Sequence, residues 1–152
     1  FVTAAGAKFN VVAPDTKNFQ INFDEFEKLV NKNTKAVIIN SPNNPSGAVY
    51  SEQTIKKLAD FLSKKSEEYG THIFIITDEP YREIVYDGVE VPYVTKYYND
   101  TIVCYSYSKS LSLPGERIGF ILVPDDIICT ISLFTIPLAF LGSSVCSHIA
   151  TL

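Results

Sequence analysis

Two joined stretches decide the fold of this chain: Lys35-Ala36-Val37-Ile38-Ile39-Asn40 and, directly after it, Ser41-Pro42-Asn43-Asn44-Pro45-Ser46-Gly47. The first is short, continuous and rich in β-branched residues, as is typical of a strand buried in a parallel sheet. The second is dense in residues that restrict or bend the backbone, which predicts a turn. Together they indicate a buried strand with polar side chains at its carboxyl end.

The same unit recurs further along the chain. His72–Thr77 predicts a second buried strand, and Asp78-Glu79-Pro80-Tyr81 follows it directly. Thr101–Tyr105 predicts a third strand, which leads into Ser106-Tyr107-Ser108-Lys109. If the three strands are parallel, their polar clusters share the carboxyl edge of one sheet, where α/β proteins place their ligands.

Amphipathic helices are predicted between the strands. Asn22 and Glu25 indicate a capping box at the start of one helix. Ser51 is expected to begin a longer helix and Gly70 to end it. The apolar side of the longer helix comprises Ile55, Leu58, Ala59 and Leu62. The alternation of strands and helices predicts an α/β fold, with a mainly parallel sheet and covering helices.

The stretch Ser106–Gly119 carries the most distinctive chemistry. Lys109 lies among small hydroxyls, and Arg117 follows eight residues later. An amine held near an anion can attack a carbonyl, and serine hydroxyls and a guanidinium are natural donors to phosphate oxygens. The pattern indicates a Schiff-base lysine beside a phosphate-binding pair, Ser106 and Arg117. A serine-rich surface loop with a solvated lysine remains an equal alternative from this stretch alone.

Three blocks resemble, in their order and spacing, the class I/II aminotransferases: Asn44–Gly47, Asp78–Tyr81 and Ser106–Gly119. These are fold-type I enzymes that use pyridoxal 5′-phosphate (PLP). The resemblance implies that residues 1–152 are a fragment of the large, PLP-binding domain, with no second domain. It also implies amino transfer between an amino acid and a 2-oxo acid, carried out by a homodimer.

The resemblance implies a role for each candidate residue. Lys109 would bind PLP covalently and then move the substrate proton as general base and acid. Asp78 would pair with the pyridine nitrogen, and Asn44 and Tyr81 would hydrogen-bond the 3′ oxygen of the ring. The implied catalytic residues are Lys109, Asp78 and Tyr81. The implied cofactor-binding residues are Asn44, Asp78, Tyr81, Ser106, Lys109 and Arg117.

Three of these residues also have plainer local interpretations. Asp78 is a suitable N-cap for a helix that starts near Pro80. Asn44 fits an ordinary turn asparagine, and Tyr81 fits a half-buried tyrosine.

Composition narrows the class of protein further. A net charge of −4 argues against a nucleic-acid partner. The three cysteines, Cys104, Cys129 and Cys146, lack metal or redox spacing, which indicates buried, reduced thiols in a cytoplasmic protein. With two histidines in the chain, no metal site is predicted. Ile127–Leu152 contains no Asp, Glu, Lys or Arg, and burial against the enzyme or a second subunit is favoured over a membrane helix.

Two alternatives to aminotransfer remain open at this stage. One is another fold-type I PLP enzyme, such as a β-lyase or a cyclase. The other is a non-catalytic PLP-fold domain that serves as a sensor or an interaction partner. The chain also contains no methionine and, by the resemblance, lacks the family's glycine-rich phosphate cup. The fragment alone is therefore expected to be inactive.

Overall fold

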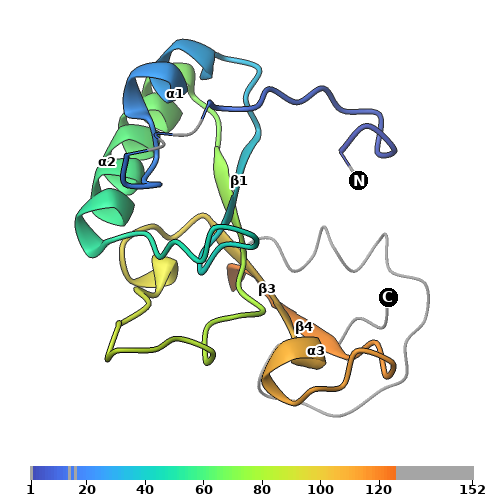
Figure 1. The fold of residues 1–152 in the computed structure, drawn as a ribbon. Coiled ribbons are helices and arrows are strands. Elements are labelled where there is room, and N and C mark those ends of the chain that lie inside the picture. Colours follow the sequence, from blue (N-terminus) through green and yellow to red (C-terminus); the bar gives the residue numbers. More distant parts are fainter. Residues whose placement is uncertain (1, 14, 16, 126–152) are drawn as a thin grey trace.

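A mixed sheet of four strands forms the centre of the computed structural model, which describes residues 2–13, 15 and 17–125 (Figure 1). The order in the sheet is β1-β2-β3-β4, with β1 parallel to β2, β2 parallel to β3, and β4 antiparallel to β3. The bounds are β1 Ala36–Asn40, β2 Phe74–Asp78, β3 Thr101–Ser106 and β4 Gly119–Leu122. The predicted mainly parallel α/β sheet is confirmed.

The helices begin and end at the signals expected from the sequence. The helices are α1 Phe23–Leu29, α2 Glu52–Tyr69, the 3₁₀ turn η1 Val94–Lys96 and the single turn α3 Tyr107–Ser110. Ser51 caps α2 by accepting a hydrogen bond from the Thr54 N–H at 3.1 Å, and Gly70 ends it in the left-handed conformation at φ 63°. Such a conformation favours glycine because it has no Cβ.

The capping box at α1 forms only in part. The Asn22 side chain accepts a hydrogen bond from the Glu25 N–H at 3.3 Å, as predicted. The Glu25 carboxylate instead pairs with Lys28 at 2.7 Å.

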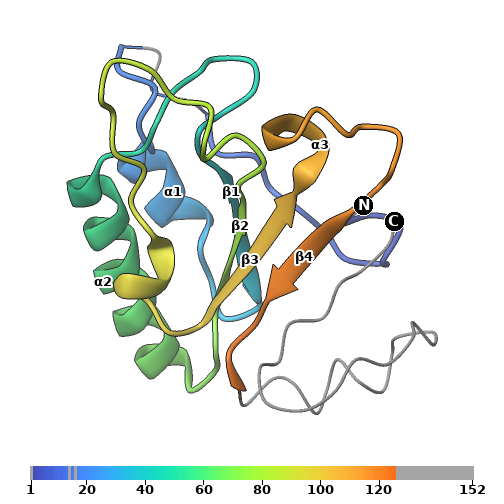
Figure 2. The same ribbon diagram turned by 90° about the horizontal axis from the view of Figure 1, so that it is seen from below.

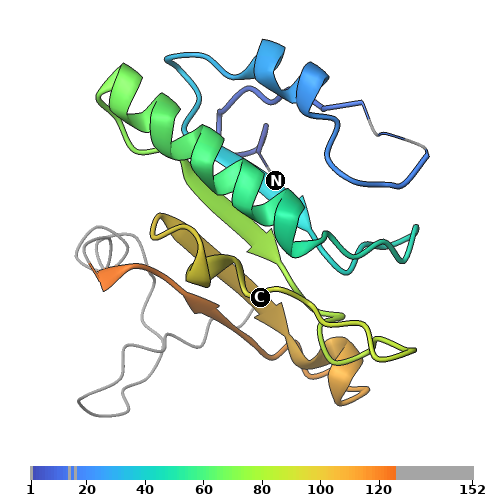
Figure 3. The same ribbon diagram turned by 90° about the vertical axis from the view of Figure 1, so that its left-hand side faces the viewer.

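One apolar core lies between the helices and the sheet. The α2 side chains Ile55, Leu58 and Leu62 are almost fully buried, as is Ile75 of β2. α1 lies beside α2 (Figure 3) and joins this core, because the Phe26 ring meets Phe61 of α2 edge-on, with centroids 5.4 Å apart. Burial of these side chains is the main force that holds the helices on the sheet.

The helices α1 and α2 lie on the same side of the sheet, which we call the covered face (Figure 2). Strand alternation puts two rows of paired residues on the opposite side, called here the open face. The rows of the open face are Ile38, Ile76 and Ile102, and Asn40, Asp78 and Cys104. Ile38 is 58% exposed. The expectation of a buried strand at Lys35–Asn40 is therefore wrong for this face, because α1 and α2 pack on the other face (Figure 2) and the described residues leave Ile38 exposed.

In the part of the chain that the structure describes, no helix is long and apolar enough to cross a membrane. The uncharged segment Ile127–Leu152, together with Cys129 and Cys146, lies outside the described residues.

Candidate active site

The carboxyl ends of β1 and β2 are joined through a residue that sequence reasoning missed. The register pairs Asn40 with Asp78, and the Asn40 amide donates to the Asp78 backbone oxygen at 2.8 Å and to its carboxylate at 3.4 Å. The Asn40 side-chain oxygen accepts a hydrogen bond from the Asn44 N–H at 3.0 Å. Asn40 thus fixes the turn that carries Asn44 to the strand that carries Asp78.

Three candidate residues from three strand ends come together. The Asn44 amide donates to the Tyr81 hydroxyl at 3.0 Å, which leaves the hydroxyl proton of Tyr81 free to be donated. The Lys109 ammonium group lies 5.8 Å from the centroid of the Tyr81 ring. This geometry is the one expected if chemically active side chains follow successive parallel strands.

Asp78 ends β2 and does not cap a helix. The residues after it, Pro80 onward, form turns, so the alternative of an N-cap fails. Its side chain is accessible and has no ion-pair partner among the described residues. Partial burial and, secondarily, the charge of Glu79 raise the pKa of the Asp78 carboxyl. A cation placed beside it would therefore be stabilised.

Cys104 lies beside Asp78 in the open-face row. It is a free thiol and only half-buried, so the expectation of a buried cysteine is wrong here, because nothing in the described residues covers this face fully. Burial, followed by the charges of Asp78 and Glu79, raises the pKa of the thiol. The thiol is therefore kept protonated and is a weak nucleophile.

Glu79, next to Asp78, belongs to the covered face and forms a buried ion pair. It is 3% exposed, and its carboxylate accepts hydrogen bonds from the Thr77 hydroxyl at 2.9 Å and the Arg82 guanidinium at 2.6 Å. Sequence reasoning missed this pair. The available signals were the strand alternation, which puts Glu79 on the same side as Thr77, and the Glu/Arg spacing of three.

Arg82 extends this network to the following loop. Its guanidinium donates to the carbonyl oxygens of Val91 and Pro92, at 2.7 and 3.0 Å, and lies 3.9 Å from the centroid of the Tyr93 ring. Because Arg82 directly follows Tyr81, its charge-assisted contacts also fix the turn that carries Tyr81.

The Ser106–Lys109 segment is organised by its own serines. The Ser106 hydroxyl accepts a hydrogen bond from the Ser108 N–H at 3.2 Å and lies 2.6 Å from the Ser108 hydroxyl. Lys109 is exposed on the one-turn helix α3. Ser106 pairs in register with Gly119, where an added Cβ would clash with the Tyr105 carbonyl oxygen. Glycine is therefore required for this close strand approach.

Arg117 is not joined to the other candidates. Its backbone is in the left-handed region, at φ 54°, and its guanidinium donates weakly to the Pro114 carbonyl at 3.4 Å. The structure describes no hydrogen bond from Arg117 to Ser106. The two residues lie on adjoining segments, because Arg117 precedes by two residues the strand partner of Ser106.

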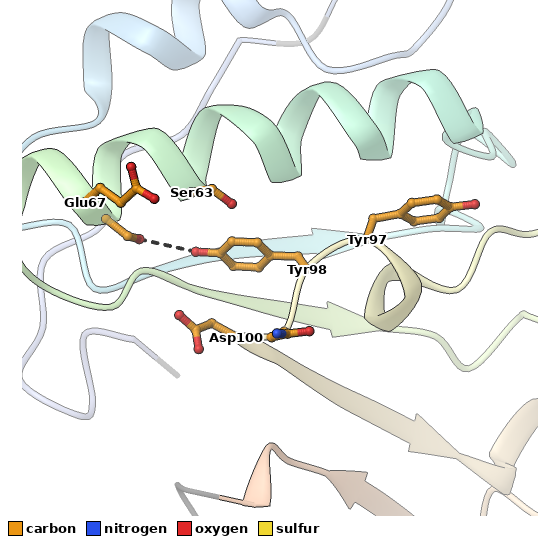
Figure 4. A pocket seen from close by; sticks show the side chains of 7 residues that line it. Ser63, Glu67, Tyr97, Tyr98 and Asp100 are labelled. Carbon is orange, nitrogen blue, oxygen red and sulfur yellow. Dashed lines mark hydrogen bonds between the residues drawn. The ribbon is translucent and has the colours of Figure 1, made fainter.

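The amino end of the sheet holds a separate surface cavity of about 350 Å³ between α2 and the segment before β3 (Figure 4). Its lining includes Ser63, Glu67 and Asp100. The Tyr98 hydroxyl there donates to the Ile73 carbonyl at 2.7 Å. None of the candidate residues lines this cavity.

The fold and the site define an α/β protein whose ligand groups gather at the carboxyl edge of a mostly parallel sheet. The sequence pattern of the family "Aminotransferase class I and II" matches residues 1–151. The chain therefore belongs to the class I/II aminotransferase family, which is PLP-dependent.

Individual relatives agree with this assignment. The chain is 36% identical to a probable aspartate/prephenate aminotransferase of Aquifex aeolicus over 125 residues, which are 80% of this chain and 30% of that protein. A crystal structure of an amino transferase from Eubacterium rectale matches with 68% identity and a TM-score of 0.81, over 84% of this chain and 32% of that chain. A PLP-dependent aminotransferase from Streptococcus suis matches with 27% identity and a TM-score of 0.72, over 87% of this chain and 33% of that chain. The chain spans about 30% of the length of the curated relatives it matches.

The residues present fit PLP by their chemistry. Asp78 offers an accessible carboxylate that has no cation beside it among the described residues, which suits a protonated ring nitrogen. The linked Asn44 and Tyr81 offer donors to an anionic ring oxygen. Lys109 offers the amine. The groups suited to the phosphate are Ser106, Ser108 and Arg117.

Proposed function

We propose that the protein carrying this chain catalyses PLP-dependent amino transfer between an amino acid and a 2-oxo acid. The observation that supports this most directly is the meeting of Asn44, Tyr81 and Lys109 at the sheet edge where Asn40 links Asn44 to Asp78. The residues come from three separate strand ends, and the arrangement needs the parallel register to form.

Each side chain has a definite task in this proposal. Lys109 would take the proton from the substrate Cα and hold it for return, as general base and then acid. Asp78 keeps the ring nitrogen protonated, while Tyr81, oriented by Asn44, donates to the ring oxygen. PLP supplies, when bound, the electron sink for the bond that breaks at Cα. Ser106 and Arg117 hold the phosphate.

The same proposal includes the domain to which the chain belongs, the oligomeric state of the whole protein and its location. Residues 1–152 form part of a large, PLP-binding domain, and the whole protein works as a homodimer in the cytoplasm. The substrate pair is an amino acid and a 2-oxo acid.

The test is a half-reaction of the natural full-length protein. Added amino acid alone should convert bound PLP to the aminated cofactor and release the matching 2-oxo acid in a 1:1 ratio, with no free ammonia. A β-lyase would release ammonia, and a cyclase would yield a ring product. A sensor domain would bind PLP with no change of the cofactor on addition of an amino acid. Any of these three outcomes would exclude aminotransfer.

Covalent labelling tests the role of Lys109 and the expected inactivity of the fragment together. Each form is incubated with PLP, reduced with borohydride and digested, and pyridoxyl adducts are located by mass spectrometry. We expect stoichiometric labelling confined to Lys109 in the full-length protein and only weak labelling in the 152-residue chain. Equal stoichiometric labelling of both would show that the short chain builds a competent site by itself.

A further inference from the structure

The hydroxyl of Tyr105 joins the two segments that carry Lys109 and Tyr81. It donates to the Glu83 carboxylate at 2.6 Å and shares a second hydrogen bond of 2.7 Å with the Ser110 hydroxyl. Glu83 lies two residues after Tyr81, and Ser110 directly follows Lys109. Between Lys109 and Tyr81 themselves, the amine lies 5.8 Å from the ring centroid.

Tyr105 is well placed to act as a fixed point. It belongs to β3, its ring stacks on Phe120 at 4.8 Å between centroids, and it meets Tyr107 edge-on at 5.3 Å. Burial, followed by the hydrogen bond to Glu83, raises the pKa of its hydroxyl. The hydroxyl therefore keeps its proton at neutral pH and remains a donor to the carboxylate.

The helix that carries Lys109 depends on contacts with other segments, among them the Tyr107 ring against Tyr105 and Phe120. α3 is a single turn of four residues, and none of them is buried. Short helices are marginal without tertiary contacts. Apart from the bonds of Ser108 to the N-cap Ser106, its described hydrogen bonds to other segments are the one from the Tyr107 N–H to the Ile118 carbonyl, at 3.1 Å, and the one between Ser110 and Tyr105.

We propose that Tyr105, with Glu83 and Ser110, forms a positioning bridge that fixes the Lys109 amine relative to the Tyr81 hydroxyl. The inference rests on the proposed function for the roles of Lys109 and Tyr81, but the bridge itself can be tested without the cofactor. Tyr105 is a positioning residue here, because its hydroxyl acts through Glu83 and Ser110.

The key variant is Tyr105→Phe, which removes the hydroxyl and leaves the ring to stack on Phe120. Its matched control is Tyr97→Phe, because the Tyr97 hydroxyl also donates to a carboxylate, that of Glu52 at 2.9 Å, on another part of the molecule. Glu83→Gln keeps an acceptor for the Tyr105 hydroxyl. It should therefore retain most of the amide protection and the labelling rate at Lys109 that Glu83→Ala loses.

The first measurement is rapid hydrogen exchange of the full-length apoprotein. The informative amides are those of Ile84, bonded to the Tyr81 carbonyl, and of Leu111 and Ser112, bonded to the carbonyls of Tyr107 and Lys109. Loss of a charge-assisted hydrogen bond should raise their exchange about fivefold in Tyr105→Phe and leave it unchanged in Tyr97→Phe. Unchanged exchange in Tyr105→Phe would overturn the bridge, whether or not PLP binds.

The second measurement is the rate of borohydride-trapped pyridoxyl labelling at Lys109. Tyr105→Phe should slow it about fivefold, and should slow it much less when Tyr81→Phe is already present, because coupled residues are not additive. Equal slowing in both backgrounds would overturn the positioning role. If the wild-type protein is not labelled at Lys109, the proposed function fails, and the exchange measurement alone decides on the bridge.

Discussion

Asp78 and Glu79 are adjacent acidic residues at the end of one strand, and they have opposite environments. Asp78 is on the open face, accessible and without a protein cation in the described residues. Glu79 is on the covered face, 3% exposed and bonded to Thr77 and Arg82. The two faces thus divide the acids into one available for a ligand and one used in the structure.

The difference shows how one sheet can be both a scaffold and a site. On the covered face, polar groups are buried together with their partners, since an unpartnered buried charge would be costly. On the open face, the Asp78 carboxylate keeps hydrogen-bonding capacity that the described residues leave unused, since its recorded partner there is the Asn40 amide at 3.4 Å. Predictions about substitutions therefore differ in kind on the two faces, with loss of activity on one and loss of stability on the other.

The largest effect is expected for Lys109→Ala, on the ligand side of the comparison. Transamination by the full-length protein should fall by about 10⁴-fold or more, because both the covalent amine and the acid–base group are lost. Some PLP binding should remain through the other contacts. The control is Lys96→Ala, since Lys96 lies against the Tyr93 ring, 5.6 Å from its centroid, and touches none of the candidate residues. Comparable turnover of Lys109→Ala and wild type would remove the site assignment.

The next effect belongs to the covered face. Glu79→Ala should lower the free energy of unfolding by about 3–5 kcal/mol, because it leaves Arg82, whose side chain is 11% exposed, as an uncompensated buried charge. Urea unfolding of the wild-type and Glu79→Ala proteins measures this difference in the free energy of unfolding. The neighbouring Asp78→Ala serves as the control and should change stability by no more than about 0.5 kcal/mol. Equal destabilisation by the two substitutions would abolish the distinction between the faces.

The sequence predicted the strand ends but could not predict this division between the faces. Short β-branched runs followed by polar turns are local signals, and so are the caps at Ser51 and Gly70, which the structure confirms. The link from Asn40 to Asp78 depends on register between strands far apart in sequence. The open face depends on what covers the sheet, and no local pattern reports that.

The candidate residues show the same limit. Following strands to their carboxyl ends was enough to bring Asn44, Tyr81 and Lys109 together. It could not find the Glu79–Arg82 pair, because the sequence alone does not show which of two adjacent acidic residues is buried in the fold. The roles assigned to all six candidate residues stay predictions, and Arg117 has no described contact with the others.

A smaller effect is expected for the activity of Asp78→Ala. Turnover of the full-length protein should fall about 10²- to 10³-fold, or about 3–4 kcal/mol of transition-state stabilisation, since a ring nitrogen without its anion is a poor electron sink. Asp78→Glu should recover part of the loss, because the charge is kept. Steady-state kinetics with saturating PLP measures this, and a loss confined to KM would argue against the electronic role.

The smallest effect is the pH dependence that Asp78 gives to the stability of the cofactor-free chain. Its folded-state pKa is raised, mainly by burial, above the ordinary value of about 3.9. As pH rises through the ordinary value toward the raised one, the unfolded state binds fewer protons than the folded state, so the unfolding free energy falls.

The substitution Asp78→Asn removes the titrating group and with it this fall in the unfolding free energy. Its stability relative to wild type should rise across that window and then stay level. The gain should reach only a few tenths of a kcal/mol, because the accessible side chain is screened by solvent. Urea unfolding of both proteins from pH 3.5 to pH 7 measures the difference. A bound cation beside Asp78 should reverse its sign, because the charged carboxylate then becomes the favoured form. A difference that does not change with pH would mean that the open face leaves Asp78 as well solvated as in the unfolded chain.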